Sequence, residues 1–196
     1  MITGFGRLGA SFAADKFDVN PDMITCAKGL TNGIIPAGAV ICRNGLYSTL
    51  MDSADREGKG SHIEFFHGYT YSGHPLAMAA GIATLEIYKE QDLFKRANDL
   101  APYFEDALHS LKGLPHVIDV RNCGLMGAVE LSPVPNLPTK RAGDIFSRCF
   151  DKGVFVRPTG STIAMSPPLT FEKKDIDRLV GTLAESIVES SLLMTT

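Results

Sequence analysis

The sequence lacks the features that would point to a membrane or to nucleic acid. No apolar run approaches the ~20 residues that a membrane-spanning helix needs, and the first residues have neither the charged nor the apolar region of a signal peptide. The net charge of −3 leaves no basic excess, which argues against nucleic acid or an anionic membrane as a main partner. We expect a cytoplasmic globular protein, as the 44% hydrophobic and 21% charged residues indicate.

A metal-ligand pattern is also lacking. The histidines His67 and His74 flank a turn without the i, i+4 helical spacing of a zinc site, so we expect no metal. The cysteines have no paired spacing, which predicts free thiols. They are Cys26, Cys42, Cys123 and Cys149.

The pattern that is present changes near residue 90. Before it, apolar runs at 23–27 and 37–42 predict buried strands, and polar residues 52–61 predict an exposed loop. The segment from Pro75 is apolar on nearly every face and predicts a largely buried helix.

Beyond residue 90, amphipathic spacing from 93 to 111 predicts a helix that Pro102 kinks or divides. A turn around Asn122 and Gly124 is expected to join the first two of four strands. The expected strands are 116–120, 125–131, 154–157 and 162–166, and the expected helices are 142–150 and one from about 172. The fold class is therefore α/β, with residues 1–90 as a piece of an α/β layer and residues 91–196 as an α+β unit.

Lys28 directly follows the first apolar run and precedes a loop rich in glycine, "GLTNGIIPAG". The ordinary interpretation is a solvent-exposed lysine at a strand end. The alternative is a Schiff-base lysine, because desolvation favours the neutral amine that attacks a carbonyl. Glycines nearby would let the backbone approach a flat ligand.

Two further positions are candidates for ligand binding. Thr70 and Ser72 precede the helix at Pro75, where free N–H groups favour a phosphate; the alternative is simple capping by a hydroxyl. Arg157 ends "GVFVR" and can hold a carboxylate with its two-pronged guanidinium. Its alternative is a surface salt bridge to Asp119 or Glu130. An amine, a phosphate site and a carboxylate-binding arginine together are what a pyridoxal-phosphate enzyme acting on amino acids requires.

Five motifs then occur in order along the chain: "ITGFGRLG", "TCAKGLTNGIIPAGAV", "HGYTYSGHPLAMAAGIATLEIY", "DVRNCGLMGAVEL" and "GVFVRPTGSTIAMSPPL". Together they resemble class III pyridoxal-phosphate aminotransferases, and among these the ω-amino acid (β-alanine):pyruvate aminotransferases. The resemblance implies fold type I, with residues 1–90 as the C-terminal part of the large cofactor-binding domain and residues 91–196 as the small domain.

The same resemblance implies a role for each candidate. Lys28 would bind pyridoxal 5′-phosphate covalently and shuttle protons. Thr70 would bind the cofactor phosphate from the neighbouring subunit of a homodimer, and Arg157 would hold the substrate carboxylate. The family reaction moves an amino group from an ω-amino acid or amine to pyruvate, giving alanine and an aldehyde or ketone.

The chain departs from the family in length. Family members are more than twice as long, and the aspartate that pairs with the pyridine nitrogen is missing, as are the upstream phosphate contacts and a stacking aromatic ring. Met1 stands where valine is usual, and Ser161 where aspartate is frequent. We expect a truncated reading frame whose product is poorly active alone; in-frame coding sequence upstream would support this, and stop codons would refute it.

Two alternatives stay open. One is another class III member, such as a 4-aminobutyrate or ornithine aminotransferase or an aminomutase. The other is a non-catalytic module that binds a partner through an exposed sheet edge, in which replacing Lys28 has no chemical effect.

Overall fold

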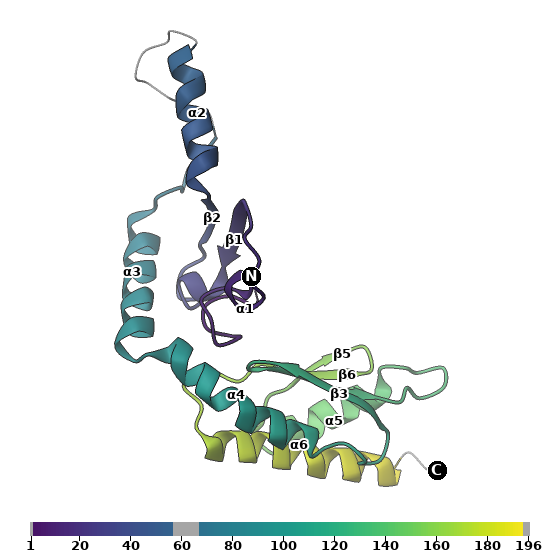
Figure 1. Cartoon of the computed structure of the whole chain (residues 1–196). Coiled ribbons are helices and arrows are strands. Elements are labelled where there is room, and N and C mark those ends of the chain that lie inside the picture. Colours follow the sequence, from purple (N-terminus) through teal and green to yellow (C-terminus); the bar gives the residue numbers. More distant parts are fainter. Residues whose placement is uncertain (1, 57–66, 194–196) are drawn as a thin grey trace. The chain divides into compact units, whose positions relative to one another are not determined.

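The computed structural model describes residues 2–56 and 67–193. They group into two compact units (Figure 1). The first unit comprises Met1–Phe5 and Phe12–Asp92, and the second comprises Gly6–Ser11 and Leu93–Thr196. The chain therefore contributes to the second unit twice, first with a short segment and then with its C-terminal part.

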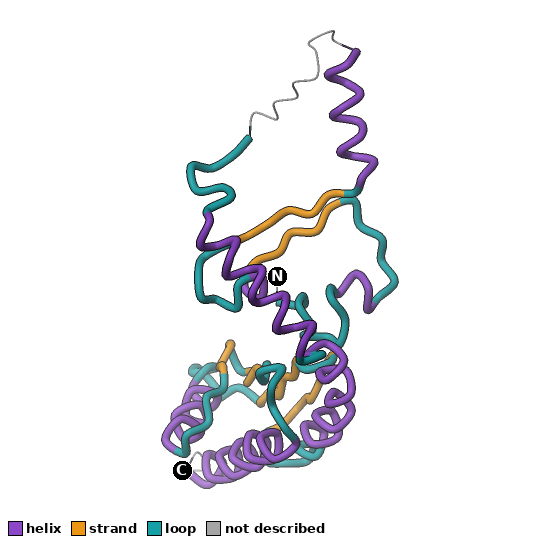
Figure 2. Tube along the Cα trace, turned by 90° about the vertical axis from the view of Figure 1, so that its left-hand side faces the viewer, coloured by secondary structure: helices purple, strands orange, loops and turns teal. Residues whose placement is uncertain are grey.

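The first unit is built around one pair of strands. In chain order its elements are α1 (Ala13–Lys16), β1 (Met23–Ala27), the 3₁₀ helix η1 (Lys28–Leu30), β2 (Gly38–Cys42), α2 (Asn44–Arg56) and α3 (Pro75–Glu90). β1 and β2 are antiparallel, and Figure 2 shows them side by side as a separate pair. Strands are found where they were expected, at 23–27 and 38–42, but their expected burial is wrong: in β1 only Cys26 is buried, and every residue of β2 is exposed. α3 begins at Pro75 as expected, because proline removes no helical hydrogen bond at the first position.

Two further expectations for the first unit are wrong. Residues 52–56 belong to α2 rather than to a loop, because "DSADR" contains no helix breaker before Gly58; residues 57–61 lie outside the described residues. α3 is not largely buried, since its buried residues are only Ala77, Gly81 and Thr84. The rest of the first unit covers one side of this helix and leaves the others open.

The second unit packs helices against a four-stranded antiparallel sheet. Its elements are α4 (Leu93–His109), β3 (Val117–Cys123), β4 (Met126–Leu131), α5 (Lys140–Asp151), β5 (Arg157–Thr159), β6 (Thr162–Met165) and α6 (Lys173–Leu193). The strand order is β3-β4-β6-β5, so β3 and β5 are the edge strands. α4 and α6 pack side by side, as Figure 1 shows.

The core of the second unit follows the periodicity of the sequence. In β4 every second residue is buried, namely Gly127, Val129 and Leu131, as expected for a strand with one face on the core. In α4 the buried residues recur at spacings of three and four; they are Leu93, Ala97, Leu100, Phe104 and Leu108. Gly127 allows close packing between the two elements, because a Cβ there would lie 2.5 Å from Leu108 Cδ2.

Some expected boundaries in the second unit are corrected. The first hairpin turns at Gly124 and Leu125, whereas Asn122 is part of β3. The strand expected at 154–157 is found at 157–159, because pairing with β6 begins only at Arg157 and residues 154–156 belong to no strand. Pro102 does not divide α4: it lies on the exposed side, where water can bind the carbonyl that loses its helical partner.

The short segment Gly6–Ser11 packs within the second unit. Leu8 is buried, and the carbonyl of Arg7 accepts a hydrogen bond of 3.0 Å from the Leu125 N–H at the hairpin turn. The Arg7 guanidinium also donates to the carbonyl of Pro167. A Cβ on Gly124, whose φ is +54°, would lie 2.6 Å from the Leu8 Cα. This turn therefore requires glycine both for its backbone conformation and for its contact with the segment.

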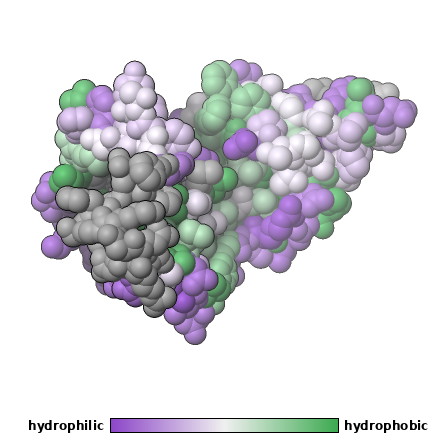
Figure 3. All heavy atoms as spheres, turned by 90° about the horizontal axis from the view of Figure 1, so that it is seen from above, coloured by the Kyte–Doolittle hydropathy of each residue, from purple (hydrophilic) through white to green (hydrophobic). Residues whose placement is uncertain are grey.

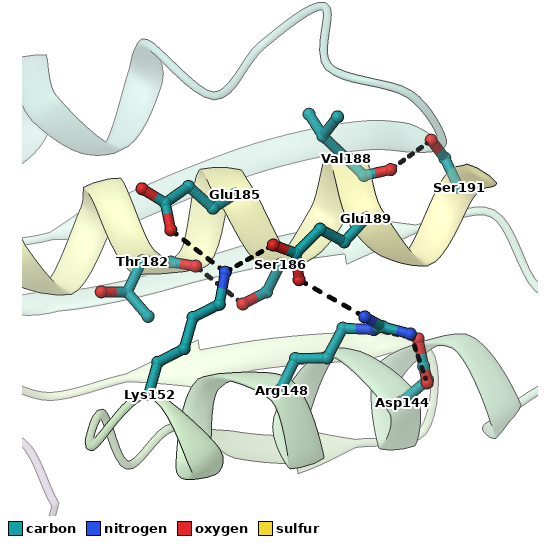
Figure 4. A network of polar contacts seen from close by, with 9 residues as sticks. All are labelled: Asp144, Arg148, Lys152, Thr182, Glu185, Ser186, Val188, Glu189 and Ser191. Carbon is teal, nitrogen blue, oxygen red and sulfur yellow. Dashed lines mark hydrogen bonds and ion pairs between the residues drawn. The ribbon is translucent and has the colours of Figure 1, made fainter. Parts of the chain in front are cut away.

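A network of charged residues joins α5 to α6 (Figure 4). Lys152 Nζ lies 3.1 Å from Glu185 Oε2 and 2.8 Å from Glu189 Oε1, and Arg148 binds Asp144 and Glu189 at 2.8 and 3.3 Å. Hydrogen bonding to Glu189 raises the pKa of Lys152, and the reciprocal bond lowers the pKa of Glu189. The network is solvent-accessible, so each pair contributes little to stability.

The described part of the chain has no helix with the length and apolar content needed to cross a bilayer. Within residues 2–56 and 67–193, no group of three or more His, Cys, Asp and Glu residues could hold a metal ion. The four cysteines are free thiols, of which Cys26 and Cys149 are buried and Cys42 is exposed.

Candidate functional site

Lys28 begins the tight turn that follows β1. Its φ of +55° lies in the left-handed region, which non-glycine residues seldom adopt. The Lys28 carbonyl accepts hydrogen bonds from the Thr31 and Gly33 N–H groups at 3.3 and 3.2 Å. Thr31 is buried, and its hydroxyl donates to the Ile35 carbonyl at 2.6 Å. The backbone at Lys28 is therefore held by several bonds although its conformation is uncommon.

Two aromatic side chains contact Gly29, the residue that follows Lys28 in this turn. Tyr88 on α3 donates a hydrogen bond from its hydroxyl to the Gly29 carbonyl at 2.8 Å. Phe5 stacks on Tyr88, with ring centroids 6.1 Å apart. A Cβ on Gly29 would lie 2.8 Å from the Phe5 ring, so only glycine fits there. α3 and Phe5 thus fix the position of the residue that follows Lys28.

The Lys28 side chain is exposed. Among the described residues, no hydrogen bond or ion pair engages its ammonium group. Lys28 is therefore exposed, as in the ordinary interpretation, and this chain alone does not provide the desolvation of a reactive lysine. An unengaged primary amine at a fixed strand end is nevertheless suited to covalent attachment to a carbonyl.

Thr70 lies in the turn before α3, and its side chain is exposed. The residue at the N-cap of α3 is His74, and no side-chain hydrogen bond caps the helix. The Ser72 hydroxyl instead accepts the Tyr69 N–H at 3.0 Å. Capping of α3 by either hydroxyl is therefore wrong, and the Thr70 hydroxyl stays available for another acceptor or donor.

Arg157 is the first residue of β5 and lies opposite Ala164 of β6. The salt bridge considered for it, to Asp119 or Glu130, is wrong. Both carboxylates bind Arg121, at 2.5 and 2.7 Å, and these bonds raise the pKa of Arg121. The exposed Arg157 guanidinium forms no ion pair with any residue that the structure describes.

A cavity of about 510 Å³ opens beside Arg157 within the second unit. Apolar residues form most of its wall, among them Val156, Met165, Phe171 and Leu179. Arg178 and Asp175 of α6 also line it. A cavity of this size with a few charged groups in an apolar wall is typical of a small-molecule site.

The three predicted site residues thus fall in both units. Lys28 and Thr70 belong to the first, where no hydrogen bond joins their side chains, and Arg157 belongs to the second. The sequence interpretation missed Tyr88 and Arg121, because their roles depend on contacts between distant segments. The only sequence signal for Arg121 is its position two residues after Asp119, which places both side chains on one face of a strand.

This chain belongs to the class III aminotransferase family. The match to the family described as Aminotransferase class-III extends over residues 1–187, and the matched segment includes all three predicted site residues.

Curated relatives agree with this assignment. The chain is 56% identical over 183 residues to an omega-aminotransferase of Caulobacter vibrioides, covering 93% of this chain and 40% of the relative. It is 42% identical to a beta-alanine–pyruvate aminotransferase of Pseudomonas aeruginosa, over 95% and 41% of the two chains. A gamma aminobutyrate transaminase 3 of Solanum lycopersicum is 35% identical, and the match covers 92% of this chain and 35% of that relative. The chain therefore spans about two fifths of the length of these relatives.

Solved transaminase structures have the same fold as this chain. A transaminase from the marine bacterium Virgibacillus superposes with a TM-score of 0.85 at 34% identity, over 99% of this chain and 45% of that one. An (S)-enantioselective omega-transaminase from Thermomicrobium roseum superposes with a TM-score of 0.85 at 34% sequence identity. The match covers 97% of this chain and 42% of that one. The α/β fold is thus that of part of a fold type I transaminase.

Class III aminotransferases depend on pyridoxal phosphate, and the donor groups of this chain fit that cofactor. The unengaged amine of Lys28 can form the covalent link, and the exposed hydroxyl of Thr70 can donate to a phosphate oxygen.

Proposed function

We propose that this chain is the lysine-bearing part of an ω-amino acid:pyruvate aminotransferase. In the proposed reaction an amine donor of the β-alanine type and pyruvate become a carbonyl compound and alanine. The observation that carries the proposal is Lys28, an unengaged amine on a backbone fixed by Tyr88 and Phe5 in a member of this family. The names of the relatives support the donor and acceptor classes.

Lys28 has two tasks in this proposal. Its Nζ would hold pyridoxal phosphate covalently. As a free amine during the reaction, the same Nζ would carry a proton between the substrate's reacting carbon and the cofactor. The cofactor, when bound, supplies an electron-withdrawing ring that stabilises negative charge at that carbon.

Arg157 and Thr70 position the reactants. Arg157 binds the carboxylate shared by β-alanine, pyruvate and alanine through a bidentate hydrogen bond. Thr70 donates its hydroxyl hydrogen to the cofactor phosphate of the neighbouring subunit, which makes the working enzyme a homodimer. We further assign residues 1–90 to the large domain and 91–196 to the small domain of a cytoplasmic enzyme.

The test is covalent trapping of the cofactor. The purified chain is incubated with pyridoxal phosphate, reduced with borohydride, digested and analysed by mass spectrometry. We expect the label on the peptide containing Lys28. The control is Lys89→Ala, which removes an exposed lysine of the same unit and should leave the Lys28 label unchanged.

Two outcomes would contradict the proposal. One is equal labelling of Lys28, Lys89 and other exposed lysines, and the other is an unchanged label in Lys28→Ala. The donor class is then tested by comparing β-alanine with 4-aminobutyrate in the assembled enzyme, with pyruvate as acceptor. A faster reaction with 4-aminobutyrate would favour the function named for the Solanum lycopersicum relative.

A further inference from the structure

The loop that joins β1 to β2 has an uncommon backbone. It comprises residues 28–37, and within it Lys28, Asn32 and Gly33 have φ values of +55°, +50° and +74°. Glycine adopts this left-handed region freely, whereas other residues do so at a cost in free energy that their surroundings have to offset. The loop therefore needs interactions that hold Lys28 and Asn32 in this conformation.

Apolar packing does little to hold the loop. Asn32, Gly33 and Pro36 are exposed, Ile34 is 75% accessible, and a Cβ on Gly33 would meet no atom within 4 Å. Figure 3 shows apolar residues, in green, at the surface of the molecule, so an apolar residue in a segment does not by itself indicate packing. Hydrogen bonds are thus the main interactions that can fix this loop.

Thr31 makes three of these hydrogen bonds. It is 2% accessible and is the only buried residue of 28–37, all of which the structure describes. Its N–H donates to the Lys28 carbonyl at 3.3 Å, and its carbonyl accepts the Ile34 N–H at 3.1 Å. Its hydroxyl donates to the Ile35 carbonyl at 2.6 Å. Almost any residue offers the two backbone groups, but only threonine or serine offers a hydroxyl of this size. A buried hydroxyl is costly without a partner, which favours keeping this bond.

We propose that Thr31 is a positioning residue for Lys28. Its hydroxyl, bound to the Ile35 carbonyl, fixes Thr31 in the loop, and the Thr31 N–H then holds the Lys28 carbonyl. The left-handed φ of Lys28 is kept in this way. A change in φ rotates the side chain relative to the preceding strand, so this conformation sets the direction in which the Lys28 amine leaves the backbone. The inference rests on the proposed function of Lys28, but its first test needs no cofactor.

Amide hydrogen exchange tests the hold on the loop. Thr31→Val removes the hydroxyl and keeps a branched side chain of similar shape. The Gly33 N–H also binds the Lys28 carbonyl, and we expect it to exchange about fivefold faster in this variant, as the loss of one hydrogen bond implies. Thr31→Ser keeps the hydroxyl and should exchange at the rate of the unsubstituted chain. The N–H groups of β1 should stay protected in both variants, as NMR can show residue by residue.

Thr84→Val is the matched control. Thr84 lies on α3 in the same unit, is 8% accessible, and donates its hydroxyl to the Ala80 carbonyl at 2.7 Å. The substitution therefore also removes a buried, hydrogen-bonded hydroxyl, but outside the loop. It should leave the exchange rate of the Gly33 N–H unchanged.

Borohydride trapping then tests the effect on the lysine itself. Each variant is incubated with pyridoxal phosphate, reduced and digested, and the label on Lys28 is divided by the label on Lys89. We expect this ratio to fall about fivefold in Thr31→Val and to stay constant in Thr31→Ser and Thr84→Val. Recovery of the ratio with serine would assign the effect to the hydroxyl rather than to packing.

Four results would overturn the inference. The first is an unchanged exchange rate of the Gly33 N–H in Thr31→Val, and the second is an unchanged labelling ratio in that variant. The third is an equal effect of valine and serine at position 31. The fourth is lost protection throughout β1 in Thr31→Val, which would make Thr31 a support of the whole unit. Equal labelling of Lys28 and Lys89 in the unsubstituted chain contradicts the proposed function instead, and the exchange of Gly33 still decides whether Thr31 holds the loop.

Discussion

The hydroxyl of Tyr88 lies 2.8 Å from the carbonyl oxygen of Gly29 and links the last turns of α3 to the residue that follows Lys28. The two residues are far apart in sequence, so the bond is a tertiary contact. It holds the turn that presents the lysine.

Tyr88→Phe deletes this hydrogen bond but keeps the ring that stacks on Phe5. One hydrogen bond contributes about 1 kcal/mol, so we expect a small loss of stability. Because the Gly29 carbonyl loses its donor, we also expect slower borohydride-trapped labelling of Lys28. Mass spectrometry of the labelled chain measures the rate, with Tyr47→Phe, an exposed tyrosine of α2, as the control. A labelling rate equal to that of the unsubstituted chain would show that Tyr88 does not position Lys28.

Gly127→Ala tests the packing of α4 on β4. The new Cβ would lie 2.5 Å from Leu108 Cδ2 and 2.9 Å from Phe104 Cζ, and both side chains are fully buried. Neither side chain has room to move, so we expect a destabilisation of about 1–3 kcal/mol in urea unfolding.

The control for that substitution is Gly143→Ala in α5. A Cβ at Gly143 meets no atom within 4 Å, and alanine favours helix over glycine by about 1 kcal/mol. Gly143→Ala should therefore stabilise the chain. Equal effects of the two substitutions would contradict the packing argument.

His116 should make stability depend on pH. Burial, and then the positive charge of Arg141, lower the pKa of His116. The native state therefore binds the proton less readily than the unfolded chain, in which the histidine pKa is about 6.5. The free energy of unfolding is therefore unaffected by His116 above about pH 6.5. It decreases as the pH falls below that value, and the decrease ends below the pKa of His116 in the native state.

His116→Asn should reduce this loss, measured as the difference in unfolding free energy between pH 7.5 and 5.5. Asparagine is a suitable replacement because the φ of His116 is +66°, a conformation that asparagine tolerates. The hydrogen bond between the His116 ring and Ser132 is also lost, which lowers stability at both pH values. A pH dependence unchanged by the substitution would exclude His116 as its source.

Arg157→Met should weaken carboxylate binding in the assembled enzyme. A hydrogen bond to a charged group contributes about 1.5–3 kcal/mol, so we expect KM for β-alanine to rise at least about tenfold. In the half-reaction with an amine donor that lacks a carboxylate, KM should stay nearly constant. Arg178→Met, which changes another arginine of the same cavity, is the control. An equal rise of KM for both donors would contradict the assignment.

Much of the fold could be predicted from periodicity. Buried residues alternate in β4 and recur every three or four residues in α4. Each pattern reflects one buried face and can be read from the local sequence. The start of α3 at Pro75 is likewise a local property. The boundaries of β5 are different: Val154 and Val156 are buried, which suggests a strand, but sheet pairing begins only where Arg157 faces Ala164. Register depends on the partner strand and is not visible in the segment itself.

For the candidate site, residue type and neighbours were enough to select Lys28, Thr70 and Arg157 as candidates, and the family match extends over all three positions. Their roles remain proposals. Whether Arg157 is paired could not be predicted, because Asp119, Glu130 and Arg121 meet only through the pairing of β3 with β4. The sequence left open whether Lys28 is exposed or desolvated, since burial at a strand end depends on the segments that pack over it.

The grouping of Gly6–Ser11 with the second unit has a consequence for protein engineering. The chain passes between the units at three peptide bonds, after Phe5, Ser11 and Asp92. A single cleavage after Asp92 would leave Gly6–Ser11 attached to the N-terminal fragment, although these residues pack in the second unit. Exchange of the C-terminal unit between two members of this family would therefore have to carry those six residues along, or the hairpin turn at Gly124 would lose the backbone on which it rests.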